Sequence, residues 1–184
     1  MANLPPIVAL VGKKKSGKTT VAVKLVSELS ARSYKVMTIK HGHHFDLDTP
    51  GTDSWRHRVE AGAQRVVLAG PNGVAIVGSW PDGESASPID LVARYLADAH
   101  IVVLEGFKHS TVPKIEIFRR GAHAAPIFSV ADAVGNNVIA VVTDHPESFV
   151  RSTIPVFDID SAALAGDLVN FLEAHLAPAL VIRR

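Results

Sequence analysis

Short apolar runs alternate with amphipathic segments along most of the chain. Residues 7–11 (IVALV) and 136–144 (NNVIAVVTD) are rich in β-branched side chains, which predicts strands that are buried on both faces. Residues 17–31 instead carry apolar side chains at helical spacing. Further strands are predicted at 35–40, 64–70, 73–80, 100–107, 113–120 and 154–160, and further helices at 53–63, 87–99 and 161–176.

Turn and cap residues mark the limits of several of these segments. The sequence Pro71-Asn72-Gly73 lies between two strand candidates and predicts a hairpin. Ser87 followed by Pro88 is typical of a helix start, because serine caps the helix and proline suits its first turn. For the helix at 53–63, either Asp53 or Ser54 is the expected cap.

The order of strands and helices predicts an α/β fold. We expect a mainly parallel sheet that is flanked by helices, with the hairpin as an extension. Residues 113–120 (PKIEIFRR) alternate between polar and apolar side chains, so this strand is expected to be half-exposed. Residues 119–136 show no regular pattern, and we interpret them as a loop that is mobile or covered by a partner.

Composition restricts the class of protein. The chain has 184 residues, 47% of them hydrophobic, which suits one sizeable core. Lys and Arg (19) nearly balance Asp and Glu (18), so binding of nucleic acid through bulk charge is not expected. With no cysteine, disulfides and thiolate metal sites are excluded. No long apolar run and no leader pattern in residues 1–6 are present, so we expect a soluble, cytoplasmic protein that does not bind membranes.

A lysine-rich loop follows the first strand, in residues 9–20 (ALVGKKKSGKTT). It is either a solvated basic patch or a site for a strongly negative ligand. Its spacing matches G-x-x-x-x-G-K-[ST], in which backbone N–H groups surround phosphate, lysine reaches the β- and γ-phosphates and the hydroxyl ligates Mg²⁺. This favours a P-loop NTPase-like fold and one nucleotide-binding domain over residues 1–184. The expected binding residues are Gly12, Lys13, Lys14, Lys15, Ser16, Gly17, Lys18, Thr19 and Thr20, with Lys18 catalytic and Thr19 on the metal. For Lys13, Lys14 and Lys15, exposure to solvent explains the charge better than contact with phosphate.

Polar residues also follow other strands, where ligands of parallel sheets bind. Glu105 is expected to hold Mg²⁺ or to orient the attacking water, although it could also be an acidic strand end in solvent. Gly106 would allow the backbone to approach a γ-phosphate. Asp144 is a candidate for reading guanine, although the N-K-x-D sequence is missing and a turn-initiating aspartate explains it equally well.

A histidine-rich loop follows the second strand. We interpret it first as a switch or substrate loop, second as solvated surface and third as a zinc site, although the spacing matches no closed zinc pattern. The candidate residues are His41, His43, His44, Asp46 and Asp48.

Three segments together resemble the MobB family of molybdopterin-guanine dinucleotide biosynthesis: VGKKKSGKTT, TIKHGHHFDLDTPGTDSWRHRVEAGA and VVLEGFKHSTVPKIEIFR. The resemblance implies a GTP-binding accessory protein with weak Mg²⁺-dependent GTPase activity, acting as a homodimer. Its implied partner is the MobA-like guanylyltransferase that attaches GMP to the molybdopterin cofactor. A small-molecule kinase is the alternative hypothesis. A third hypothesis is an adaptor that senses nucleotide without hydrolysing it.

Overall fold

A computed structural model of the chain describes residues 4–42, 48–79, 87–129 and 132–176. The chain divides into two compact units, one made of residues 1–41 and 87–184 and the other of residues 42–86. That both units act as one nucleotide-binding domain stays a prediction. None of the helices in the described ranges is long and apolar enough to cross a membrane.

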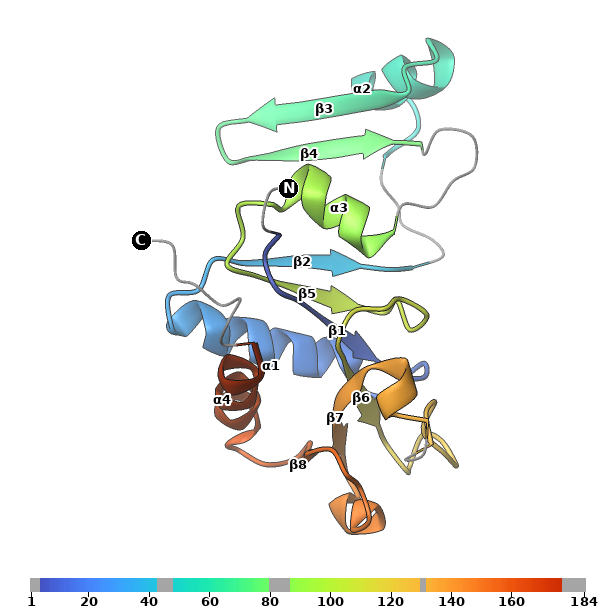
Figure 1. Cartoon of the computed structure of the whole chain (residues 1–184). Helices are drawn as coiled ribbons and strands as arrows, with labels where there is room; N and C mark the ends of the chain where they lie inside the picture. Colours follow the sequence, from blue (N-terminus) through green and yellow to red (C-terminus); the bar gives the residue numbers. More distant parts are fainter. Residues whose placement is uncertain (1–3, 43–47, 80–86, 130–131, 177–184) are drawn as a thin grey trace. The chain divides into compact units, whose positions relative to one another are not determined.

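A sheet of six strands forms the centre of the first unit (Figure 1). Every neighbouring pair in it is parallel, in the order β2-β5-β1-β6-β7-β8. The expected α/β fold with a mainly parallel sheet is therefore confirmed. The strands are β1 (Ile7–Val11), β2 (Val36–Lys40), β5 (Ile101–Glu105), β6 (Lys114–Phe118), β7 (Val138–Thr143) and β8 (Val156–Asp158).

Helices cover both faces of this sheet. On one face, α1 (Lys18–Ala31) and α4 (Leu164–Leu176) pack together over the strands, and on the other face lies α3 (Pro88–Tyr95). Ser87 caps α3 as expected, because its hydroxyl accepts a hydrogen bond from the Asp90 backbone N–H at 3.2 Å. Two short 3₁₀ helices, η3 (Val134–Asn136) and η4 (Pro146–Phe149), lie in the connections before and after β7.

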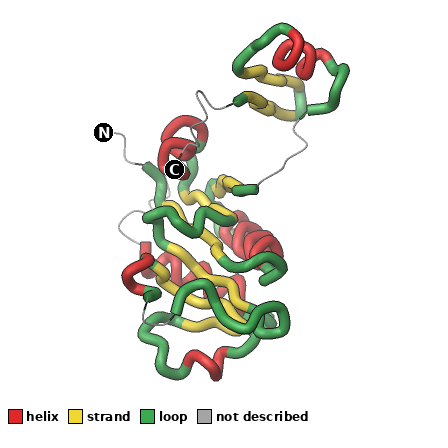
Figure 2. Tube along the Cα trace, turned by 90° about the vertical axis from the view of Figure 1, so that its right-hand side faces the viewer, coloured by secondary structure: helices red, strands yellow, loops and turns green. Residues whose placement is uncertain are grey.

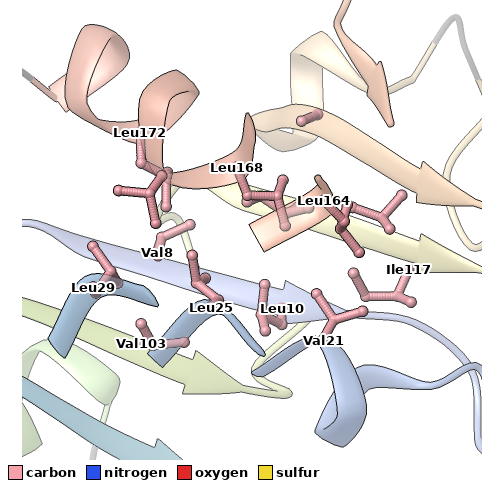
Figure 3. Packing of buried hydrophobic residues seen from close by; sticks show 14 of the residues in the cluster. Val8, Leu10, Val21, Leu25, Leu29, Val103, Ile117, Leu164, Leu168 and Leu172 are labelled. Atoms are coloured by element: carbon pink, nitrogen blue, oxygen red, sulfur yellow. The ribbon is translucent and has the colours of Figure 1, made fainter. Parts of the chain in front are cut away.

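The larger core cluster lies beneath α1 and α4. Figure 3 shows Leu25 of α1 beside Leu10 of β1, with Leu168 of α4 above them, and all three are fully buried. Each such leucine contributes roughly 1.5–3 kcal/mol by leaving water. Because α1 is fixed along its whole length in this way, the loop that precedes it is held at the carboxyl end of β1.

Strand β6 is fully buried, so the expectation of a half-exposed strand at 113–120 was wrong. The alternating polar residues are Lys114 and Glu116, and both are buried with partners, since β6 lies between β1 and β7. The Lys114 ammonium donates to the carbonyl oxygens of Val112 (3.1 Å) and Asn136 (2.7 Å), and burial lowers its pKa. The alternation of polar and apolar residues in β6 therefore comes from two buried charges that have hydrogen-bond partners, and not from a face in solvent.

Strand β6 is also staggered along the sheet. Lys114, its first residue, pairs with Ala9 in the middle of β1, and Glu116 pairs with Val11 at the end of β1. The last residues of β6 therefore extend past the end of β1, alongside the loop that begins at Gly12. This stagger brings residues 116–119 next to the candidate site.

The second unit is a hairpin with a short helical segment (Figure 2). Its strands β3 (Arg65–Gly70) and β4 (Gly73–Gly78) pair antiparallel around Pro71 and Asn72, which confirms the expected hairpin. The helical segment consists of α2 (Asp53–Trp55) and the π-helical turn η1 (Arg56–Glu60). Neither Asp53 nor Ser54 stands at its cap position, because α2 begins at Asp53 itself and Thr52 precedes it.

Candidate functional site

The loop of residues 12–19 joins β1 to α1 at the carboxyl edge of the sheet. Gly17 occupies the cap position of α1 with φ of 96°, and Lys15 has φ of 66°, so both lie in the left-handed region. Backbone of this kind turns successive N–H groups toward one point, and the start of α1 adds its positive end. The local geometry therefore suits an anion, as the glycine and lysine spacing predicts.

Gly12 has no room for a side chain. A Cβ atom there would lie 2.4 Å from the Ile117 carbonyl oxygen and 2.6 Å from the Ser16 hydroxyl oxygen. The wall on this side is the staggered end of β6, which explains physically why glycine begins the loop. Among the described residues, the Ser16 hydroxyl is buried without a hydrogen-bond partner.

Lys18 is the first residue of α1, and its side chain folds back over the loop. Its ammonium donates a hydrogen bond to the Lys13 carbonyl oxygen at 2.7 Å. Partial burial lowers the pKa of Lys18, Glu105 opposes this change and Lys40 adds to it. The ammonium thus lies inside the loop, where an incoming phosphate would meet it.

Thr19 and Glu105 meet across the carboxyl ends of β1 and β5. The Thr19 hydroxyl donates to the Glu105 carboxylate at 2.8 Å, so the two expected metal ligands lie together. The Lys40 ammonium, at the end of β2, is 3.5 Å from the same carboxylate oxygen. Sequence reasoning missed Lys40, although its place as the last residue of a strand next to β5 follows from the sheet order.

His41 and Gly106 lie side by side just beyond these strand ends. The His41 N–H donates to the Glu105 carbonyl oxygen and the Gly106 N–H to the Leu10 carbonyl oxygen, both at 2.9 Å. Gly106 has φ of 101°, and a Cβ there would approach the His41 Cβ to 3.1 Å. The His41 ring packs at 4.9 Å from the Phe107 ring. The start of the histidine-rich loop and the end of β5 are therefore in contact.

Of the other candidate residues of the histidine-rich loop, Asp48 is the one that the structure describes. His43, His44 and Asp46 lie outside the described residues. Asp48 belongs to the second unit, where its carboxylate accepts from the hydroxyls of Ser54 (2.9 Å) and Thr52 (3.3 Å) and lies 3.4 Å from the Arg58 Nε. These contacts give Asp48 a local role at the start of α2. Over the described ranges, no cluster of three or more His, Asp or Glu side chains is arranged to hold a metal ion.

A second polar group flanks the loop on the β6–β8 side. The Asp144 carboxylate accepts a hydrogen bond from the Arg120 N–H at 2.9 Å, while Arg119 pairs with Asp160 at 3.1 Å. A Cβ at Gly17 would lie 3.4 Å from the Arg119 Nε, so this group borders the start of α1. Asp160 carried no motif signal in the sequence and was missed.

Residues 7–144 match the sequence model of the family described as molybdopterin guanine dinucleotide synthesis protein B, MobB. The chain belongs to the MobB family. The match spans the Gly12–Thr19 loop, Glu105 and Asp144, and it confirms the resemblance noted in the sequence. It also confirms the expected accessory role in molybdopterin guanine dinucleotide synthesis.

Relatives of the MobB family support the assignment over most of the chain. The molybdopterin-guanine dinucleotide biosynthesis adapter protein of Escherichia coli is 34% identical over 160 residues, which cover 86% of this chain and 89% of that protein. The adapter protein of Haemophilus influenzae is 35% identical over 168 residues, 89% of this chain and 88% of that one.

Solved MobB structures share the fold. The crystal structure of Bacillus subtilis MobB superposes with a TM-score of 0.67 at 21% identity and covers 90% of this chain and 96% of that one. A MobB homologue from Bacillus stearothermophilus gives a TM-score of 0.63 at 22% identity, covering 91% and 98%. With this agreement, the expected P-loop NTPase-like fold is confirmed.

Proposed function

We propose that this chain is a GTP-binding accessory protein of molybdenum cofactor synthesis, with slow Mg²⁺-dependent GTPase activity. The observation that carries the proposal is the contact between Thr19 and Glu105 at the mouth of the Gly12–Thr19 loop. A hydroxyl on the phosphate loop and a carboxylate at the end of a neighbouring strand are the groups that hold Mg²⁺ in such folds. The family makes the guanylyltransferase of this pathway the expected partner, in the cytoplasm.

The contact between Thr19 and Glu105 also indicates how a bound nucleotide would be oriented. Thr19 and Glu105 would hold Mg²⁺ beside the terminal phosphates, so the γ-phosphate would lie on the β5 side of the loop, near Glu105. The nucleoside would then leave the loop on the opposite side, over the ends of β6, β7 and β8. Arg119, Asp144 and Asp160 lie on that side. This orientation supports Asp144 as the base-reading carboxylate of the proposal.

Asp144 gives a test of base selectivity. A carboxylate that faces guanine accepts from its N1–H and its 2-amino group, whereas adenine offers no such pair of donors. We expect the wild-type chain to prefer GTP over ATP, and Asp144→Asn to weaken GTP binding about tenfold while ATP binding changes little. Calorimetric titration of both nucleotides, with and without Mg²⁺, measures this. Asp167→Asn, an amide exchange on α4, is the matched control, and an unchanged preference in Asp144→Asn would assign guanine recognition to another residue.

No observation favours the small-molecule kinase alternative. A kinase lid usually presents arginines to the transferred phosphate, and in this chain Arg119 is paired with Asp160. Arg151 lies in the connection between η4 and β8 and is exposed. The accessory GTPase is therefore the function we propose.

We further propose that the chain acts as a homodimer through the second unit. On the hairpin, Val67 pairs with Ile76 and Ala69 with Val74, and paired residues of this kind share one face. The large side chains there are exposed: Val67 58%, Val74 69% and Ile76 47%. A contiguous apolar sheet face suits a self-complementary interface with a second copy.

Charge on this face is expected to separate the copies. Val74→Asp would place a carboxylate in the interface, where its desolvation is costly, so the variant is expected to sediment as a monomer and the wild-type chain as a dimer. Analytical ultracentrifugation measures the mass. Val150→Asp, at a position that is 83% exposed in the first unit, is the matched control. A monomeric wild-type chain, or a dimeric Val74→Asp variant, would contradict the proposed interface.

A further inference from the structure

Glu116 is a buried carboxylate that the proposed chemistry does not use. It is 2% exposed, on the part of β6 that extends alongside the Gly12–Thr19 loop. Its two oxygens accept hydrogen bonds from the backbone N–H groups of Ile127 and Phe128, the second at 3.2 Å. Burial raises the pKa of Glu116, while these two donors and Lys13 act in the opposite direction. A buried carboxylate is costly without such partners, so the segment that supplies them is held firmly.

That segment, residues 122–129, is here called the strap. It returns to the Gly12–Thr19 loop at two further points. The Lys13 ammonium donates to the Ala125 carbonyl oxygen at 2.8 Å, and His123 Nε2 lies 2.6 Å from the Lys14 carbonyl oxygen. A carbonyl oxygen only accepts hydrogen bonds, so His123 must carry its hydrogen on Nε2 and donate it.

The contact to the Lys14 carbonyl fixes one peptide unit of the loop. The peptide group is planar and trans, so its C=O and its N–H point in opposite directions. When His123 holds the Lys14 carbonyl outward, the N–H of Lys15 is directed to the other side. Lys15 is the residue with left-handed φ, where such loops turn their N–H groups toward the anion.

We propose that Glu116 and His123 are positioning residues for nucleotide binding: Glu116 anchors the strap, and His123 on the strap orients the Lys14–Lys15 peptide toward the phosphates. The inference rests on the proposed function, because it concerns the same loop. It assigns Lys13 to the strap rather than to the phosphates, which alters the role expected for that residue from the sequence. Neither positioning residue itself touches the nucleotide.

The test measures, in the same variants, the affinity for GTP and the rate of hydrogen exchange in the strap. We expect Glu116→Gln and His123→Ala each to weaken GTP binding about tenfold in calorimetric titration, by loss of one oriented donor. The double variant is expected to lose no more than the stronger single variant, because both act through one contact. Pyrophosphate is expected to show the same loss, since the base is not involved. Hydrogen exchange at Ile127 and Phe128 should quicken in Glu116→Gln.

Two controls separate positioning from general destabilisation. Lys114→Met removes the other buried charge of β6, at its far end, and is expected to bind GTP as the wild-type chain does. His175→Ala removes a histidine from the end of α4. His123 is only partly buried, so His123→Ala tests the inference even where Glu116→Gln fails to fold. Variants that bind GTP within twofold of the wild-type chain, with faster exchange in the strap, would overturn this inference alone. A wild-type chain that binds no GTP would overturn the proposed function and this inference with it.

Discussion

Lys18→Ala is expected to abolish GTP binding, a loss of about a hundredfold or more, while the chain stays folded. The ammonium of Lys18 lies inside the Gly12–Thr19 loop and is bound there only by the Lys13 carbonyl among the described contacts. Its removal leaves no cation at the centre of the phosphate site. The core beneath α1 is unaffected, because it is built from Val21, Leu25 and Leu29. Calorimetric titration and thermal unfolding together measure both expectations.

The matched control is Lys24→Ala, which removes the same charge from an exposed position of the same helix. It is expected to bind GTP as the wild-type chain does. If Lys18→Ala bound GTP with near-wild-type affinity, the assignment of the loop to phosphate would fail. Equal losses in both variants would instead indicate a long-range charge effect rather than a specific contact.

A second large effect is expected from Glu105→Gln. The variant should still bind GTP, because the loop and Lys18 are unchanged, but hydrolysis should fall by about a hundredfold. The carboxylate accepts from Thr19 and lies beside Lys40, and the amide keeps the shape of Glu105 while removing its charge. Both Mg²⁺ affinity and the orientation of water depend on that charge. Single-turnover phosphate release at saturating GTP and Mg²⁺ measures the rate.

Glu173→Gln is the matched control for this amide exchange. Glu173 pairs with Arg32 at the far end of α1 from the loop, so its variant should hydrolyse GTP at the wild-type rate. A wild-type rate in Glu105→Gln as well would remove Glu105 from the mechanism. The water or the metal would then have to be held by another side chain near the loop.

The parts of this molecule that depend on neighbouring residues could be predicted from the sequence. The phosphate loop is local, since Gly12 and Gly17 through Thr19 lie within one turn between a strand and a helix. The position of Glu105 at the end of an apolar strand could likewise be predicted from the sequence. In the structure its carboxylate accepts a hydrogen bond from the Thr19 hydroxyl. The hairpin around Pro71 could also be predicted, because the turn residues that specify it are neighbours in the sequence.

Features that depend on sheet order and register could not be predicted in this way. The burial of Glu116 follows from the place of β6 between β1 and β7, which its own alternating pattern does not encode. Lys40 meets Glu105 across 65 positions of sequence only because β2 is the neighbour of β5. The strap contact of His123 likewise depends on the stagger of β6. In each case a tertiary contact decides the role of the residue.

The division of the chain into two units has a consequence for the way the sequence can vary. Residues 42–86 lie between β2 and α3 in the chain, and their described part contributes no strand to the six-stranded sheet. Long insertions between fixed ends cost little closure entropy. The hairpin can therefore change in length and surface without altering the register of the sheet, so the family can acquire new docking faces while its phosphate loop stays the same.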